Sequence, residues 1–176
     1  KLKLPPGKRK EHLKQVDHLL ERFEAKVRET NGLSVIKFLK TGSLRKGTVL
    51  RPRDGYGVDA DIAVFIKVDS TQLDLTQLHE KIRELLRAVY PSKQNEDFSI
   101  QPRTLGITFR ESDLAVDLVP VLPDHQDPDF GWQPSSKNLP PVRTSISKQL
   151  DFIRNRRERY ANLSAVVRLL KQWRNH

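Results

Sequence analysis

The stretch that most constrains the fold is "VDADIAVFI", which runs from Val58 to Ile66. From Ile62 onward it is apolar and rich in branched side chains, which predicts a strand buried on at least one face. A run as apolar as this is expected inside a sheet rather than at its edge. Asp59 and Asp61 stand at its head, and residues two apart on a strand project from the same face. The acidic end of this strand is therefore expected to open onto a cleft.

Two carboxylates crowded onto one face repel each other unless a cation lies between them. Hard oxygen ligands suit Mg²⁺ or Mn²⁺, and a metal held there would activate a hydroxyl and neutralise phosphate charge. For an isolated pair, the alternative is that Asp59 and Asp61 merely solvate an exposed strand end.

A third carboxylate, Asp117, lies within the apolar run "DLAVDLVPVL", which is expected to form another buried strand. An unpaired charge in such a strand is costly, so Asp117 should be paired or should coordinate a metal. Asp113 lies beside Glu111 and Ser112 and is expected in the preceding turn. Asp117 is therefore the stronger candidate for a third metal ligand.

The segment "TGSLRKGT", from Thr41 to Thr48, supplies a Gly-Ser turn shortly before the acidic strand. A small pair such as Gly42 and Ser43 lets backbone N–H groups approach a phosphate closely, and the hydroxyl adds a donor. Arg45 and Lys46 place positive charge nearby. Taken alone, such a pair is more often a hairpin connection or a helix cap.

The remaining patterns predict a mixed α/β sheet flanked by helices. Amphipathic spacing predicts helices over residues 11–30, 73–90, 145–160 and 163–174, and turn-bounded β-rich runs predict strands within 98–101, 104–110 and 113–122. Residues 33–40 fit either a strand or a helix end, and residues 51–57 a loop. We expect an N-terminal helical region at 1–32 that packs on both lobes, a core at 33–123, a proline-rich connection at 124–141 and the start of a helical lobe at 142–176.

Composition narrows the class of protein. The 32 Lys and Arg residues outnumber the 22 Asp and Glu residues, a net charge of +10 that favours polyanionic partners or, equally, a merely solvated basic surface. With no cysteine and no apolar run long enough to cross a bilayer, the sequence predicts a soluble, cytoplasmic protein with no membrane partner. The absence of methionine, and a last helical pattern without a terminator, lead us to expect more chain beyond His176.

The order of these motifs resembles the polymerase-β-like nucleotidyltransferase superfamily. "TGSLRKGTVLRP" followed by "VDADIAVFI" is similar, more specifically, to the bacterial relatives of cyclic GMP-AMP synthase and oligoadenylate synthase, the cyclic-oligonucleotide synthases of anti-phage signalling systems. The likeness runs from about Leu33 to Val121 and resumes in "SAVVRLLKQWR".

The resemblance implies a role for each matching residue. Gly42 and Ser43 correspond to the turn that holds the triphosphate of the incoming nucleotide. Asp59 and Asp61 correspond to two metal ligands, and Asp117 to a third that also helps to deprotonate the attacking ribose hydroxyl. Lys171 is similar to a lysine that contacts nucleotide phosphates, although a solvated lysine on an amphipathic helix is nearly as good an account of it.

The implied reaction uses two Mg²⁺ or Mn²⁺ ions to join ribonucleoside triphosphates, ATP among them, into a cyclic di- or trinucleotide with release of pyrophosphate. An activating protein or nucleic acid is a possible further partner. Two alternatives stay open at this point. One is a nucleotidyltransferase that adds nucleotides to an RNA end or a protein, and the other is a catalytically idle module that binds nucleic acid, against which the intact set of three aspartates argues.

Overall fold

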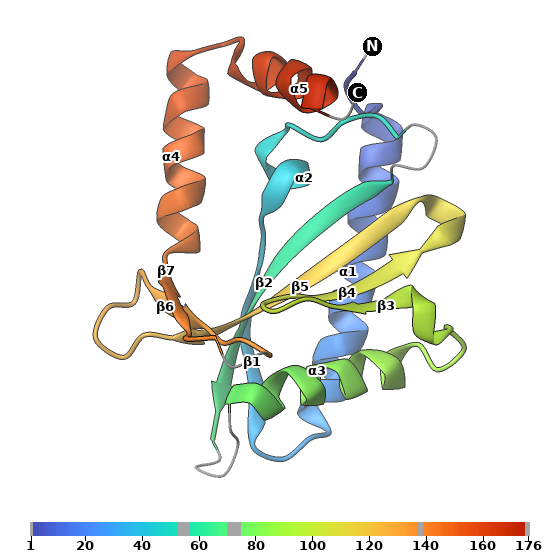
Figure 1. Ribbon diagram of the computed structural model, residues 1–176, viewed down its shortest axis with the longest axis vertical. Helices are drawn as coiled ribbons and strands as arrows, with labels where there is room; N and C mark the ends of the chain where they lie inside the picture. Colours follow the sequence, from blue (N-terminus) through green and yellow to red (C-terminus); the bar gives the residue numbers. More distant parts are fainter. Residues whose placement is uncertain (1, 53–56, 70–74, 137–138, 175–176) are drawn as a thin grey trace.

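The computed structural model describes residues 2–52, 57–69, 75–136 and 139–174 (Figure 1). Of residues 75 and 76 it describes the backbone only. The helices are α1 (Pro6–Arg28), α2 (Gly42–Lys46), α3 (Leu75–Val89), α4 (Ile146–Arg159) and α5 (Leu163–Arg174), with 3₁₀ turns η1 (Asn95–Asp97) and η2 (Arg110–Ser112). The strands are β1 (Leu33–Lys40), β2 (Val58–Val68), β3 (Phe98–Ile100), β4 (Leu105–Phe109), β5 (Leu114–Pro123), β6 (Gly131–Gln133) and β7 (Val142–Thr144).

The centre of the molecule is a mixed sheet with the strand order β1-β2-β5-β4-β3. β2 pairs with β5 in parallel, while β1, β4 and β3 pair antiparallel with their neighbours. β2 is flanked on both sides by other strands, as the apolar run "IAVFI" predicts. β6 pairs with the end of β5 and with β7, and β7 leads into α4.

Alternation along the two parallel strands divides the sheet into two unlike faces. Val58, Ala60 and Ile62 of β2 and their neighbours on β5 point into the main hydrophobic core. The same core contains the apolar faces of α1 and α3, including Phe23 and Ile82. Because successive side chains of a strand point to opposite faces, the residues between these positions point to the other side of the sheet.

The opposite face is covered only in part. Near β6 and β7 it carries a small buried cluster of Ala63, Phe65 and Val121, against which Ile146 of α4 packs. Nearer the amino ends of β2 and β5 it carries acidic residues instead. In Figure 1, α4 stands beside this part of the sheet and α5 crosses close to α2. Neither α4 nor α5 buries a residue fully, so both line open space rather than core.

The elements follow most of the sequence-based expectations. The first helix begins at Pro6 rather than at residue 11, and the region expected to open a helical lobe begins with β7. The Gly-Ser segment forms the five-residue helix α2 rather than a turn, and the proline-rich connection contains β6. Residues 33–40 form a strand, which resolves that alternative. Four residues of the loop expected at 51–57, namely 53–56, lie outside the described part of the chain. No helix within the described residues is both long and apolar enough to cross a membrane.

Candidate active site

Parallel pairing of β2 and β5 brings the predicted carboxylates together. Asp61 and Asp117 are register partners in this pairing, and Asp59 is the register partner of Ala115. All three alternate with core residues and therefore project from the incompletely covered face of the sheet. Asp61 and Asp117 are half-buried, and Asp59 is exposed. Asp113 lies in the turn after η2, as expected, and does not belong to this cluster.

The end of β1 fixes α2 next to Asp61. The backbone N–H and the hydroxyl of Thr41 both donate to the carbonyl oxygen of Asp61, at 2.7 and 3.1 Å. Leu44 anchors the other side of α2 in the main core, and the N–H of Thr48 donates to the carbonyl of Ser43 at 3.0 Å. These contacts hold Gly42 and Ser43 beside the acidic strand.

Two glycines make room for the carboxylates. A Cβ atom on Gly42 would lie 1.6 Å from Oδ2 of Asp61, and Gly42 has a φ of +57°, which a side chain would strain. A Cβ atom on Gly106 of β4 would lie 2.8 Å from Oδ1 of Asp117. Both positions therefore admit no larger residue without moving an acidic side chain.

Burial and mutual repulsion perturb the acidic cluster. Burial, followed by the carboxylates of Asp61 and Asp59, raises the pKa of Asp117 to about 6. Desolvation and then the Asp61 carboxylate raise the pKa of Asp59, while the Lys171 ammonium acts in the opposite direction. In the described part of the chain, no Lys or Arg forms an ion pair with any of the three carboxylates.

Lys171 of α5 faces the same cluster across the pocket. Desolvation and the nearby Arg174 guanidinium lower the pKa of Lys171, whereas Asp61 and Asp59 act to raise it. Its ammonium is thus close enough to the acidic strand to interact with it electrostatically. This position distinguishes Lys171 from a lysine on an isolated, solvated helix face.

All six residues singled out from the sequence line one pocket of about 480 Å³. They are Gly42, Ser43, Asp59, Asp61, Asp117 and Lys171. The pocket is also lined by residues to which the sequence gave no role, which are Thr48, Ile153, Leu163, Ser164 and Val167, and by Lys46, which was expected only to support the loop. Arg157 belongs to a basic run that could touch phosphates but for which a solvated helix face is the better account from sequence alone, so only the placement of α4 reveals its position.

Strand order, helix placement and the position of the acidic cluster agree with the class that the sequence motifs indicated. In sequence and in fold the chain resembles the polymerase-β-like nucleotidyltransferase superfamily. Within that superfamily it resembles the bacterial cyclic-oligonucleotide synthases of anti-phage systems, which confirms the narrower resemblance as well.

Three comparisons carry these statements. The chain is 31% identical over 176 residues to the CBASS oligonucleotide cyclase CdnC of Escherichia coli strain KTE188, covering 99% of this chain and 56% of that protein. It superimposes on the structure of E. coli MS115-1 CdnC with ATP with a TM-score of 0.73 and 33% identity, covering 98% of this chain and 54% of the other. For the complex of E. coli MS115-1 CdnC with HORMA-deltaN the TM-score is 0.71, at 30% identity, with 98% and 52% covered. No protein-family model matches the sequence.

The chain spans about half the length of the relatives that it matches. The shared part includes the whole sheet, α2 and both helices that line the pocket.

Proposed function

We propose that the chain is the catalytic part of a metal-dependent nucleotidyltransferase that joins ribonucleoside triphosphates into a cyclic di- or trinucleotide for anti-phage defence. The observation that carries this proposal is the convergence of Asp59, Asp61, Asp117, the Gly42–Ser43 pair and Lys171 on one pocket. The relatives support it, because one is named as an oligonucleotide cyclase and a related structure contains ATP. Since ribonucleoside triphosphates are intracellular, the proposal includes a cytoplasmic location.

A pair of Mg²⁺ or Mn²⁺ ions fits the donor set. The three side chains offer only carboxylate oxygens, which these ions prefer. Burial, followed by the Asp61 and Asp59 carboxylates, raises the pKa of Asp117, which is consistent with a site that a cation would stabilise. Within the described residues, no three acidic, histidine or cysteine side chains already stand as a ligand set, so the carboxylates would turn toward a bound ion. When bound, such ions neutralise phosphate charge and acidify the attacking hydroxyl.

The chain's own residues would then divide the remaining tasks. Gly42 and Ser43 would contact the triphosphate, and Lys171 and Arg157 would hold phosphate oxygens from the opposite wall. The apolar side chains of Leu163 and Val167 would pack against the nucleoside. This arrangement would fix the α-phosphorus near the carboxylates of β2 and β5.

The proposed transfer step needs only the two nucleotides as reactants. The ribose hydroxyl oxygen bonds to the α-phosphorus, the bond to the pyrophosphate leaving group breaks, and the hydroxyl proton passes to a carboxylate oxygen of Asp117. A second transfer within the linear product closes the ring.

An activating protein is a further part of the proposal. A structure of a related CdnC contains HORMA-deltaN, and this chain resembles that CdnC over nearly its whole length. We therefore propose that the full activity depends on a protein partner, with a nucleic acid as a second possible activator.

The test is product formation from labelled ribonucleoside triphosphates and Mg²⁺ without an added acceptor, using the complete protein with and without its activator. We expect phosphatase-resistant small products from the wild type and none from the Asp59→Ala, Asp61→Ala double variant. The matched control is Glu21→Ala, Glu24→Ala, which removes the same charge from α1. If the label appeared only on added RNA or protein, the cyclase proposal would be rejected in favour of a nucleotidyltransferase that modifies such an acceptor.

A further inference from the structure

A second hollow shares α2 as a wall with the active-site pocket. Its volume is about 750 Å³, and it is lined by six cationic residues, Lys3, Arg9, Arg45, Arg154, Arg157 and Arg168. Glu158 is the single acidic residue among the described residues that line it. We refer to this hollow as the basic pocket. Gly42, Ser43 and Lys46 of α2 line the active-site pocket, whereas Arg45 and Gly47 line the basic pocket.

The cations of the basic pocket come from five different segments that are held in place. Lys3 is fixed by an isolated β-bridge to Leu50 and by the hydrogen bond from the N–H of Arg51 to the carbonyl of Leu2, at 2.8 Å. Nη2 of Arg9 donates to the carbonyl of Leu44 at 3.3 Å, and Nη1 of Arg168 donates to that of Gly47 at 2.6 Å. These bonds tie α1 and α5 to the backbone of α2, so the charges surround the hollow from several sides.

The positive charge of the basic pocket is largely uncompensated. In the part of the chain that the structure describes, no carboxylate forms an ion pair with Arg9, Arg45, Arg157 or Arg168. Arg154 is the exception, since its Nη2 lies 2.6 Å from Oδ1 of Asp151. Like charges gathered in a concave site repel one another and concentrate the local potential, and a bound anion relieves both effects.

We propose that the basic pocket binds a small polyphosphate anion beside the active-site pocket, with which it shares Arg157 and Ser164 as lining residues. Guanidinium groups match phosphate oxygens with paired hydrogen bonds, and five of the six cations are arginines. The volume lies in the range of small-molecule sites, and the cations face one another across a hollow. A nucleic-acid duplex is better served by cations spread along an open face. The polyphosphate is either free or part of a nucleotide, and both share this chemistry.

The test is calorimetric titration of the protein with sodium tripolyphosphate in the presence of EDTA. Without divalent ions the three carboxylates of the active-site pocket repel a triphosphate, so the titration measures the basic pocket. We expect one saturable site and at least about tenfold weaker binding by the Arg9→Gln, Arg45→Gln double variant, since charge-assisted hydrogen bonds are lost. ATP as a second titrant identifies the source, because equal affinity indicates recognition of phosphate alone and tighter binding indicates a nucleotide.

The matched control is the Lys8→Gln, Lys10→Gln double variant, which removes two cations from the same helix outside the pocket. It should bind tripolyphosphate as the wild type does. If the Arg9 change lowers the thermal stability, the single Arg45→Glu variant replaces the double variant in the titration and should also bind tripolyphosphate more weakly. Arg45 is exposed and forms no ion pair with any described residue, so this change should leave the fold intact. No saturable binding, equal weakening by the two double variants, or binding of a DNA duplex in preference to tripolyphosphate would each overturn the proposal.

Discussion

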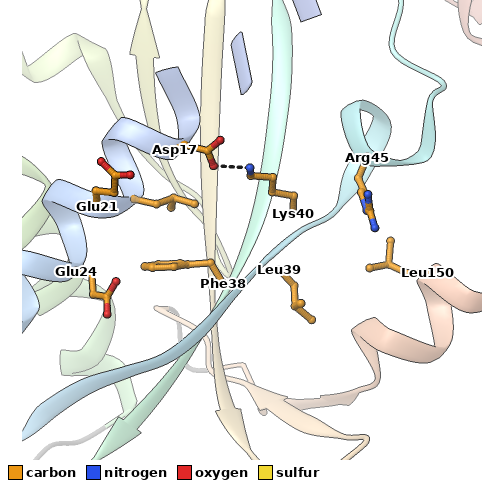
Figure 2. A pocket seen from close by; sticks show the side chains of 9 residues that line it. Asp17, Glu21, Glu24, Phe38, Leu39, Lys40, Arg45 and Leu150 are labelled. Carbon is orange, nitrogen blue, oxygen red and sulfur yellow. Dashed lines mark ion pairs between the residues drawn. The ribbon is translucent and has the colours of Figure 1, made fainter. Parts of the chain in front are cut away.

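Two groups of three carboxylates in this molecule differ in how the backbone spaces them. Asp17, Glu21 and Glu24 of α1 line a pocket of about 500 Å³ beside β1, which Figure 2 shows. Asp59, Asp61 and Asp117 line the active-site pocket. The α1 group follows one helix face, where residues three or four apart lie one above another.

The two groups also differ in their partners. Figure 2 shows the ion pair between the Asp17 carboxylate and the ammonium of Lys40. Glu24 pairs with Arg28, which lies outside that view, at 2.6 Å. The strand group has no such partner among the described residues, and its two central members face each other in register. Two of the three acids on α1 therefore have a cation as a partner, whereas the parallel pairing of β2 with β5 brings the like charges of Asp61 and Asp117 together. This difference supports the proposal that a bound cation neutralises the strand group.

The largest expected effect comes from filling the space between α2 and the strand carboxylates. In Gly42→Ala the new methyl group must displace Asp61, which lies 1.6 Å from its position, and the positive φ adds strain. We expect nucleotidyl transfer to fall by about 100-fold or more and the free energy of unfolding by about 1–3 kcal/mol. Steady-state kinetics and urea denaturation measure the two effects.

The matched control for this change is Gly7→Ala on α1, where a Cβ atom meets nothing within 4 Å. It should leave both quantities unchanged or slightly raise the stability. Wild-type transfer by Gly42→Ala would show that the position of Asp61 under α2 is not needed for the reaction.

A smaller effect on the free energy of unfolding is expected from removing the charge of Asp117. Asp117 has a pKa of about 6 in the folded protein and an ordinary value of 3.8, so the folded state binds the proton more tightly. Its contribution to stability therefore falls as the pH rises from about 4 to 6 and then stays constant. In EDTA at pH 7, Asp117→Asn should raise the free energy of unfolding by about 1–2 kcal/mol relative to the wild type, after allowance for solvent screening, while abolishing transfer.

Urea denaturation at pH 4, 5 and 7 measures this difference, which should shrink toward zero at pH 4. Added Mg²⁺ should stabilise the wild type more than Asp117→Asn. Glu21→Gln on α1 serves as the control and should show neither effect. Parallel stability curves for the wild type and Asp117→Asn would mean that neither burial nor repulsion by Asp61 and Asp59 raises the pKa of Asp117 appreciably.

The smallest effect is expected from the helix group. Asp17→Asn breaks an ion pair whose acidic side chain is 51% exposed. The free energy of unfolding should fall by no more than about 0.5 kcal/mol, with less change at high salt, and transfer should be unaffected. Thermal unfolding at two salt concentrations checks this. A loss above about 1 kcal/mol would remove the distinction between the two acidic groups.

The sequence predicted the strand group well because its signal is local. An apolar run with acids at alternate positions defines both the strand and the face of Asp59 and Asp61, and the same pattern identifies Asp117. The parallel register that sets Asp61 opposite Asp117 could not be derived in this way, because pairing between distant strands leaves no local periodicity.

Short elements and long-range neighbours escaped prediction for related reasons. β6 has only three residues, too few for an alternating pattern, and lies among prolines. Gly106 shows no sign in the sequence of its proximity to Asp117, and Arg157 is one of several arginines along α4. Their roles depend on which segments pack beside them, so they emerge only from the assembled fold.

The internal position of β5 also bears on how the protein folds. β5 must insert between β2 and β4, and it pairs with β2 across a long intervening segment of chain. Such non-local parallel pairing is slow to form, and here the same event drives Asp117 against Asp61. Repulsion therefore opposes the closing of the sheet. Refolding should accelerate when the carboxylates are protonated or when divalent cations are present, so the ions proposed for the reaction would also assist the chain in completing its core.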